Sequence, residues 1–394
     1  MSKTWIAVYL LSSAVGVAQE APREWIDPAT HHRIIRLSDE PGSKSLYFHQ
    51  NAYTAKGDLM VFTTPTGLSV IDLHTRKIRP LVEGRVGDVV VARHKRQVFY
   101  FKGDTIYATS LDSGETRAII TKPELRSGSG LAVNADETLL AGSFVEGTSP
   151  QTASPSTGVP QPQGDNYPGK GEMMERRLAA RIPMALYTVN IQSGEVKTFN
   201  HDTDWLNHVQ FSPTDPNLIL FCHEGPWHKV DRIWTIHTDG TGLRKIHTRT
   251  MDMEIAGHEF FGADGKTVWY DLQTPKGKEF WLAGVVLATG EPIRYKVNRP
   301  EWSVHYNVSS DGKLFAGDGG GPNSVAAPGN GQWIYLFTTS PGVLKAEKVV
   351  DLSKHDYKLE PNVTFTPDGK WIVFRSNMFG PTHVFEVEVK KAQE

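Results

Sequence analysis

The sequence predicts an all-β chain folded as a seven-bladed β-propeller, with the ring closed by an N-terminal strand. A unit made of a polar turn and an apolar strand recurs along the chain, its copies are regularly spaced, and long helical patterns are absent. The turns are often Asp-Gly between apolar runs, which is a strong hairpin signal. A repeat of this length in an all-β chain is typical of propeller blades.

The unit occurs seven times, and most copies begin about 40 to 57 residues apart. After each copy a second strand runs into a charged turn. The regular spacing favours a propeller over the alternative fold, a β-sandwich with many turns. The copies are TAKGDLMVF (54–62), RHKRQVFYF (93–101), NADETLLAG (134–142), SPTDPNLILF (212–221), GADGKTVWY (262–270), SSDGKLFAG (309–317) and TPDGKWIVF, which ends at Phe374.

The ends of the chain and one long gap complete the predicted ring. The last unit ends on HVFEVEV, one outer strand short of a full blade. The segment RIIRLS (33–38) is predicted to supply that strand, which would close the ring and hide two strand edges. The gap holds residues 147–170, which are rich in Pro, Gly and Ser and read as an insertion without a packed core. The next segment, GEMMERRLAAR (171–181), has a short helical composition, and its three arginines form either a solvated face or a flap over an anionic ligand.

The first residues resemble a secretory signal. One Lys precedes an apolar run that is too short to span a bilayer, and small residues place cleavage after Ala18. We therefore expect a signal peptide over residues 1–18 and one propeller domain over 19–394, in the periplasm or secreted. Cys222 is the single cysteine, so no intrachain disulfide forms.

The net charge of the chain and the length of its apolar segments limit the classes of partner that we expect. A formal net charge of −2 gives no reason to expect nucleic acid or an anionic membrane surface as a partner. No second segment approaches the length of a membrane span. We expect a monomer or a small homo-oligomer.

Histidines mark the predicted mouth of the ring. The chain has 15 His, and three of them, His208, His258 and His305, fall just before a blade-opening turn. Equivalent places in neighbouring blades converge on one face, so these side chains are predicted to meet. In the first blade, YFHQN brings His49 and Gln50 to a matching place. His208, His49 and Gln50 are therefore candidates for binding a substrate, or else they satisfy one another.

One stretch, FCHEGPWHKVDRIW (221–234), contains two histidines, a glutamate and an arginine around a Gly-Pro turn, and a turn between two strands does not require them. With FCHEGP, VDRIW, GHEF, SVHYNVSSDGKLFAGDG and FTPDGKWIVFRS, the chain resembles the oligogalacturonate lyase family over nearly its whole length after residue 25. The opening WIDPATHHRIIRL also resembles the start of that family. The resemblance implies a seven-bladed propeller that cleaves short pectin fragments by β-elimination.

The resemblance also implies roles for individual residues. The proton at C5 of a uronic acid is only weakly acidic, so its removal needs a base and a cation that neutralises the adjacent carboxylate. By resemblance His258 matches the base and Arg232 the residue beside the carboxylate. His223 is expected to take part with them, and His305 matches a metal ligand. Tyr306, next to His305, is a candidate for contacting the substrate.

The last blade departs from the family pattern. The family supplies a Gln and two His before FTPD, whereas this chain has Tyr357, Glu360 and Asn362 there. His305, Glu360 and Asn362 are predicted to hold a divalent metal, Mn²⁺ or Ca²⁺, unless Arg alone meets the carboxylate. The change favours an acidic oligosaccharide other than oligogalacturonate as the substrate.

Two classes of function remain open from the sequence. The first is a polysaccharide lyase acting on a uronic-acid glycan. The second is a non-catalytic propeller that binds a glycan or a protein partner. A hydrolytic propeller is disfavoured because the chain has no Gly-x-Ser-x-Gly stretch.

Overall fold

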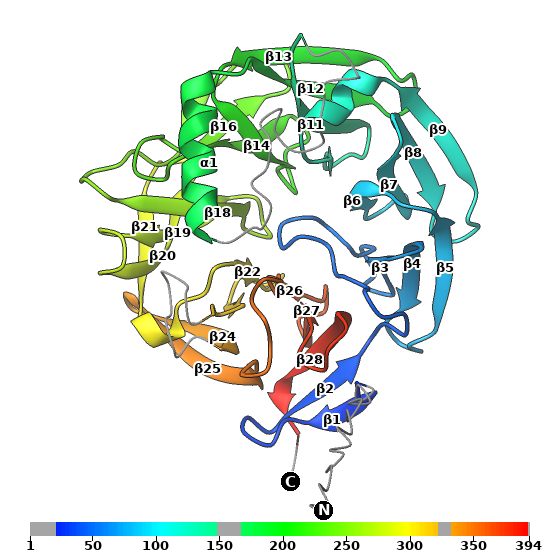
Figure 1. The fold of residues 1–394 in the computed structure, drawn as a ribbon, viewed down its shortest axis with the longest axis vertical. Coiled ribbons are helices and arrows are strands. Elements are labelled where there is room, and N and C mark those ends of the chain that lie inside the picture. Colours follow the sequence, from blue (N-terminus) through cyan, green and yellow to red (C-terminus); the bar gives the residue numbers. More distant parts are fainter. Residues whose placement is uncertain (1–20, 148–166, 322–331, 393–394) are drawn as a thin grey trace, which may run out of the picture.

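The computed structural model describes residues 21–147, 167–321 and 332–392. Within them antiparallel sheets follow one another around a ring, and their strands succeed one another outward from the axis (Figure 1). The sheets make seven blades, and a single parallel pair, Lys296 with Val343, links the sheets of blades 5 and 6. The predicted all-β propeller is confirmed.

The blades follow the sequence units in order. Blade 1 has three strands, and Tyr53 extends its inner edge by pairing with Met60. The strands of blades 1 to 3 are β3 (Leu59–Thr64), β4 (Gly67–Asp72) and β5 (Ile78–Glu83); β6 (Gly87–Ala92), β7 (Gln97–Lys102), β8 (Thr105–Ser110) and β9 (Thr116–Thr121); β10 (Ala132–Val133), β11 (Leu139–Val145), β12 (Met184–Asn190) and β13 (Val196–Asp202).

Blades 4 to 6 have four strands each. They are β14 (Trp205–Phe211), β15 (Leu218–Glu224), β16 (Ile233–His237) and β17 (Arg244–Lys245); β18 (Ile255–Phe261), β19 (Thr267–Gln273), β20 (Phe280–Val286) and β21 (Pro292–Val297); β22 (Tyr306–Val308), β23 (Leu314–Gly317), β24 (Trp333–Ser340) and β25 (Val343–Asp351). Two short 3₁₀ helices, η1 (Pro123–Ser127) and η2 (Arg299–Glu301), precede blades 3 and 6.

Both ends of the chain build blade 7. Its strands are β26 (Thr364–Phe365), β27 (Trp371–Ser376) and β28 (His383–Lys391), followed outward by β2 (His32–Arg36) and β1 (Glu24–Ile26). The predicted closure by residues 33–38 is therefore confirmed, since β2 pairs with β28. Because the first and last strands share a sheet, opening the ring would expose two strand edges.

The core lies between neighbouring blades. Successive strand residues point to opposite faces of a sheet, and both faces of each blade are covered by the next blade, so the strands are apolar on both sides. Phe99 and Tyr187 pack together between blades 2 and 3. Trp269 and Phe315, with ring centroids 5.0 Å apart, pack between blades 5 and 6.

Helix α1 (Tyr167–Ala180) lies in the connection between β11 and β12 and includes most of the predicted helical segment. Two of its neighbouring arginines are engaged by the protein. The guanidinium of Arg177 lies 4.5 Å from the ring centroid of Trp205, and Arg181 forms an ion pair with Asp204. Most of the predicted insertion 147–170, and the predicted signal peptide, lie outside the described residues. Among the described residues no helix is long and apolar enough to cross a membrane.

A loop between β2 and β3 reaches the centre of the ring (Figure 1). Its residues 47–51, called the plug segment below, are anchored to several blades. The backbone N–H of Phe48 donates to Asn362 Oδ1 at 3.2 Å, and Asn307 Nδ2 donates to the Phe48 carbonyl at 3.3 Å. Asn51 Nδ2 donates to the Val91 carbonyl at 2.8 Å. The plug segment is thus held from blades 2, 6 and 7.

Candidate active site

The three histidines predicted to converge do so at the ring axis. His208 lies on β14, His258 on β18, and His305 just before β22, at the inner edges of three successive blades. The ring centroids of His258 and His305 are 4.6 Å apart. His49 of the plug segment lies 5.3 Å from His208 by the same measure. Four imidazoles therefore gather at one end of the plug segment.

Backbone bulges aim two of these side chains. His208 and His258 adopt positive φ angles of 50° and 47°, and the strand register shifts at both places. A bulge interrupts the alternation of a strand and re-aims the side chain at that point. A non-glycine residue in this conformation is strained, so the surrounding structure has to hold it there.

Tyr47 stands between the histidines. Its ring centroid lies 5.6 Å from that of His208 and 5.4 Å from that of His305, and its hydroxyl is 3.2 Å from His305 Nε2. Burial raises the pKa of Tyr47 well above its usual value, and the charges of Glu360 and Glu224 raise it further. The Tyr47 hydroxyl therefore keeps its proton at neutral pH.

His258 is paired with a carboxylate that fixes its tautomer. His258 Nδ1 lies 2.7 Å from Asp271 Oδ1, on the adjacent strand β19. A carboxylate accepts but does not donate, so Nδ1 carries the proton and Nε2 keeps its lone pair in the neutral ring. Burial lowers the pKa of His258 below 6.5, although Asp271 opposes this effect. His258 is thus neutral at pH 7 and can accept a proton at Nε2.

His305 forms a second histidine–carboxylate pair, but its pKa is shifted in the opposite direction from that of His258. Asp318 accepts from the His305 backbone N–H at 2.8 Å, and its other oxygen lies 2.7 Å from Nδ1. Burial on its own would lower the pKa of His305, but the charges of Asp318 and Glu360 outweigh it and the pKa is raised. His305 is therefore the more cationic of the two neighbouring imidazoles.

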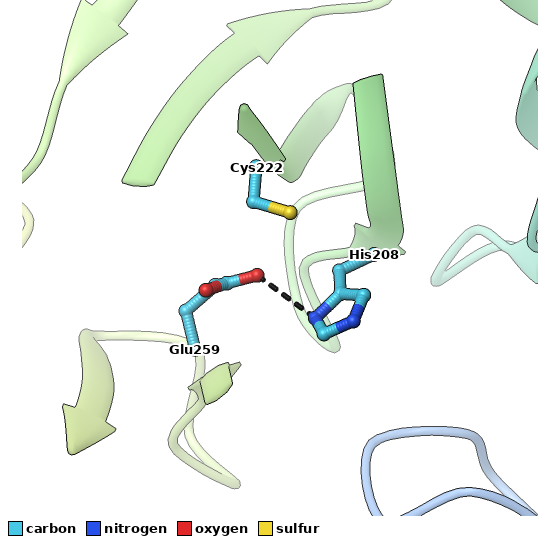
Figure 2. A group of neighbouring side chains, drawn as sticks. All are labelled: His208, Cys222 and Glu259. Carbon is cyan, nitrogen blue, oxygen red and sulfur yellow. Dashed lines mark hydrogen bonds and ion pairs between the residues drawn. The ribbon is translucent and has the colours of Figure 1, made fainter. Parts of the chain in front are cut away.

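Arg232 anchors a buried ionic cluster beside these pairs. Its Nε donates to Glu259 at 2.9 Å, and a terminal nitrogen lies 3.1 Å from Glu224. Glu259 also lies 3.1 Å from His208 Nδ1, as Figure 2 shows. Burial raises the pKa of Glu259, yet Arg232 and His208 outweigh it and hold that pKa well below its usual range. The cluster thus keeps the Glu259 carboxylate ionised.

Two groups in the site have metal-ligating chemistry. One ligand atom each from His208, Cys222 and Glu259 lies within 4.8 Å of the others (Figure 2). Arg232, however, already supplies the positive charge that an ion would bring to this group. In the second group His305 Nε2 lies 3.8 Å from Glu360 Oε2. Imidazole nitrogen and carboxylate oxygen are donors that Mn²⁺ accepts.

Comparison with known proteins identifies the family. A family model described as oligogalacturonate lyase matches residues 172–392, which is more than half of the chain. The chain belongs to the oligogalacturonate lyase family. It is 26% identical over 390 residues to oligogalacturonide lyase of Pectobacterium atrosepticum, covering 92% of this chain and 95% of that protein. It is 29% identical over 221 residues to oligogalacturonate lyase of Dickeya dadantii, covering 52% and 55%.

Two solved structures of oligogalacturonate lyases share the fold. One, in complex with manganese, superposes with a TM-score of 0.79 at 24% identity and covers 93% of this chain and 96% of that chain. The other, from Vibrio parahaemolyticus, gives a TM-score of 0.77 at 23% identity and covers 94% and 97%. Membership in the family confirms the predicted resemblance and the predicted enzyme class, a lyase.

The structure places His223 away from the cluster, in contrast to its predicted catalytic part. Adjacent residues of a strand point to opposite faces. On β15, Glu224 faces Arg232, so His223 faces blade 3, where its Nδ1 lies 3.2 Å from Asp204 and its ring stacks on Trp234. Glu224, the next residue of the same motif, takes the place at the ring axis.

Two further predictions differ from the geometry. Asn362 is buried, and its amide is committed to the backbone: Oδ1 accepts from Phe48, and Nδ2 donates to the Glu360 carbonyl. It therefore lacks the free oxygen that the predicted metal site requires. Tyr306 is also buried, packed edge-on against Trp302, with its hydroxyl accepting from a backbone N–H. Tyr306 thus belongs to the core between blades 5 and 6 and does not reach the site.

The remaining predicted residues are divided by the plug segment. His49, His208, His258, His305 and Arg232 belong to the histidine end. Gln50, predicted to contact substrate, lines a cavity together with His49. Glu360 is the one predicted metal ligand of the last blade whose carboxylate faces His305.

Several contributors were not predicted from the sequence. Tyr47, Asp271 and Glu259 each contact a predicted histidine from another blade or strand, and spacing in sequence gives no sign of such pairings. Arg375 of β27 donates to two backbone carbonyls, those of Glu360 and Ser45. Burial lowers the pKa of Arg375, while Glu360 and Tyr47 act in the opposite direction. A second guanidinium therefore stands near the site with less compensation than Arg232 has.

Proposed function

We propose that this chain is a polysaccharide lyase that cleaves a uronic-acid-containing oligosaccharide by β-elimination. The observation that carries the proposal is the His258–Asp271 pair at the mouth of a propeller of the oligogalacturonate lyase family. The pair presents an unprotonated Nε2 at neutral pH beside two guanidinium groups and the more cationic His305.

His258 is the base of the reaction. Its Nε2 takes the proton from C5 of the uronic acid, the electron pair forms the C4–C5 double bond, and the C4–O bond breaks. The leaving oxygen gains a proton from the site or from water. An imidazole whose pKa lies somewhat below the working pH is largely unprotonated and suits proton abstraction. Asp271 holds the ring in the required tautomer and stabilises the imidazolium that forms.

Cationic groups stabilise the charge that develops on the substrate carboxylate. Arg232 contacts Glu224, Glu259 and, through a terminal nitrogen 3.4 Å away, His208 Nδ1, but a guanidinium has five N–H donors, so donors remain for a ligand. Arg375 supplies further positive charge from blade 7. Donors arranged before the reaction stabilise the enolate-like transition state more than the ground state.

A divalent metal fits the second group of ligands. His305 Nε2 and Glu360 Oε2 are a nitrogen and an oxygen donor 3.8 Å apart, and the related lyase structure is a manganese complex. We propose that His305 and Glu360 hold Mn²⁺ here. When bound, the ion would polarise the substrate carboxylate as a Lewis acid. Addition of EDTA should lower the rate, and Mn²⁺ should restore it more fully than Ca²⁺ because of the imidazole ligand.

The substrate is proposed to differ from simple oligogalacturonate. The last blade presents Glu360 and a committed Asn362 where the family pattern has two His, so a carboxylate replaces a neutral ligand beside the reacting group. A uronic-acid oligosaccharide of another composition, such as a glucuronate- or rhamnogalacturonan-type glycan, fits this change. The signal-like residues 1–18 support a periplasmic or secreted location for the enzyme.

The decisive experiment is a panel of uronic-acid oligosaccharides followed by the ultraviolet absorbance of the unsaturated product. At least one should give product with the wild type and none with His258→Ala. If no glycan in a broad panel gives product, the non-catalytic alternative, a propeller that binds a glycan or protein, takes its place. Sequencing the N-terminus of the mature protein from fractionated cells tests the location.

A further inference from the structure

A cavity lies against the plug segment, and His208, His258 and His305 are not among the residues that line it. It has a volume of about 330 Å³ and is lined by residues from all seven blades, mainly inner strands and the turns that follow them. Phe48, His49, Gln50 and Asn51 of the plug segment form its inner end. The base His258 therefore lies outside the cavity. Its volume lies at the lower end of small-molecule sites.

Arg93 occupies an unusual place in the lining. It is the first residue of the turn after β6, and in five other blades the equivalent side chain caps its own turn by accepting a backbone N–H. Those residues are Thr54, Asn134, Ser212, Ser309 and Thr366. In blade 2 the turn is capped by a residue of the adjacent blade: Glu137 accepts from the backbone N–H groups of His94 and Lys95, each at 2.7 Å. The Arg93 side chain is thus not needed for its turn.

The charge of Arg93 is incompletely compensated. Its side chain is exposed to solvent, and no hydrogen bond or ion pair joins it to any residue that the structure describes. The protein atoms around this exposed residue still desolvate its guanidinium in part and lower the pKa of Arg93, and the charge of Glu137 offsets this effect only in part. A guanidinium held near a low-dielectric wall without a counter-ion attracts an anion.

The two asparagines that line the cavity beside the plug segment, Asn51 and Asn307, are already engaged. Asn51 donates to two backbone carbonyls, those of Tyr53 and Val91. Asn307 donates to the Phe48 carbonyl and accepts from the Phe365 backbone N–H. Among the lining residues, Arg93 is therefore the cation available to an anionic ligand, and the walls around it are largely apolar.

We propose that this cavity binds a small organic carboxylate through Arg93. A guanidinium matches a planar carboxylate with two parallel N–H donors. One guanidinium balances one negative charge, whereas a phosphate dianion would face the nearby Glu137 carboxylate with a charge left over. Valine and phenylalanine side chains on the walls favour a ligand with a carbon body. The site is distinct from the catalytic centre and does not depend on the lyase activity.

Calorimetric titration of the full chain tests the site. The probes are D-galacturonate and pyruvate as carboxylates, D-galactose as a neutral sugar and inorganic phosphate as a polyvalent anion. Both carboxylates should bind the wild type, and Arg93→Gln should weaken pyruvate by at least about tenfold, the cost expected for one charged partner. Galacturonate can also occupy the catalytic site, so for this probe Arg93→Gln should remove one of two binding events.

The matched control is Lys56→Gln. Lys56 is an exposed cation on the corresponding turn of blade 1 and does not line the cavity. This variant should bind as the wild type does, and both variants should keep the wild-type melting temperature and lyase rate. The proposal fails if the wild type binds neither carboxylate, if Arg93→Gln binds pyruvate unchanged, if Lys56→Gln loses as much affinity, or if phosphate or galactose binds as tightly.

Discussion

Strand alternation decides which residue of a motif reaches the chemistry. In the motif FCHEGP, the sequence points to His223 as the catalytic residue. In the structure Glu224 forms the ion pair with Arg232, whereas His223 packs against Trp234. The sequence shows both residues, but it does not show which face of β15 points toward the ring axis. His208 and His258 escape this rule because a bulge re-aims them, and bulges are not visible in the sequence pattern.

Substitution of His258 should separate it from His223. His258→Ala should lower kcat by about 10²- to 10⁴-fold, the contribution of a positioned general base. His223→Asn should retain most of the activity because its partners, Asp202 and Asp204, lie off the site. Initial rates on the substrate found in the panel measure both. Equal losses in the two variants would show that the strand orientation described here does not govern catalysis.

Asp271 should act by positioning His258. Asp271 raises the pKa of His258 against the lowering effect of burial. In Asp271→Asn that pKa should fall, so the acid limb of kcat/KM against pH should move to lower pH. The plateau should fall on the order of 10²- to 10⁴-fold, because the amide no longer enforces the Nδ1–H tautomer. An acid limb that stays in place would rule out His258 as the group that titrates.

At the scale of the element, the turns were the most predictable part of the fold. Asp-Gly turns between apolar runs located the strands and the number of blades, and RIIRLS was correctly matched to the outer edge of blade 7. The position of the plug segment was not predictable. Its sequence, YFHQN, has no pattern of its own, and contacts from three distant blades hold it in place.

Strand β28 carries a buried carboxylate at the ring closure. Glu386 is fully buried and pairs with Arg76 from the turn after β4, across the boundary of blades 7 and 1. Burial raises the pKa of Glu386 to about 7, with Arg76 opposing the effect. The folded state therefore binds the proton more tightly than the unfolded chain, and this group costs stability as pH rises from about 4.5 to 7.

Replacing Glu386 with Gln should remove that dependence. At pH 8 the variant should be more stable than the wild type by up to about 3 kcal/mol, the free energy of a shift of this size. Below pH 4.5 the two should differ little. Urea unfolding at both pH values measures the difference. A wild type that is the more stable protein at pH 8 would mean that the ion pair with Arg76 outweighs the burial of Glu386.

For the whole molecule, cohesion depends on a ring with no free end. Blades contact only their neighbours, so the closure by β2 and β28 joins the last interface to the first. Deletion of residues 1–36 should expose the edge of β28, lower the melting temperature and promote association between chains. Deletion of residues 1–20 should leave both properties unchanged, because every described strand remains. Calorimetry and light scattering of the two variants provide the comparison.

The plug segment leaves the histidines accessible from one side of the ring. A propeller channel that ran from face to face would let a glycan chain pass through the molecule. Here Phe48 and its neighbours, bonded to blades 6 and 7, close that passage between the histidines and the Arg93 cavity. A substrate bound at the histidines would therefore enter, and both products would leave, on the histidine side of the plug segment. Such an enzyme suits short chains or chain ends, and each turnover requires release before the next cut.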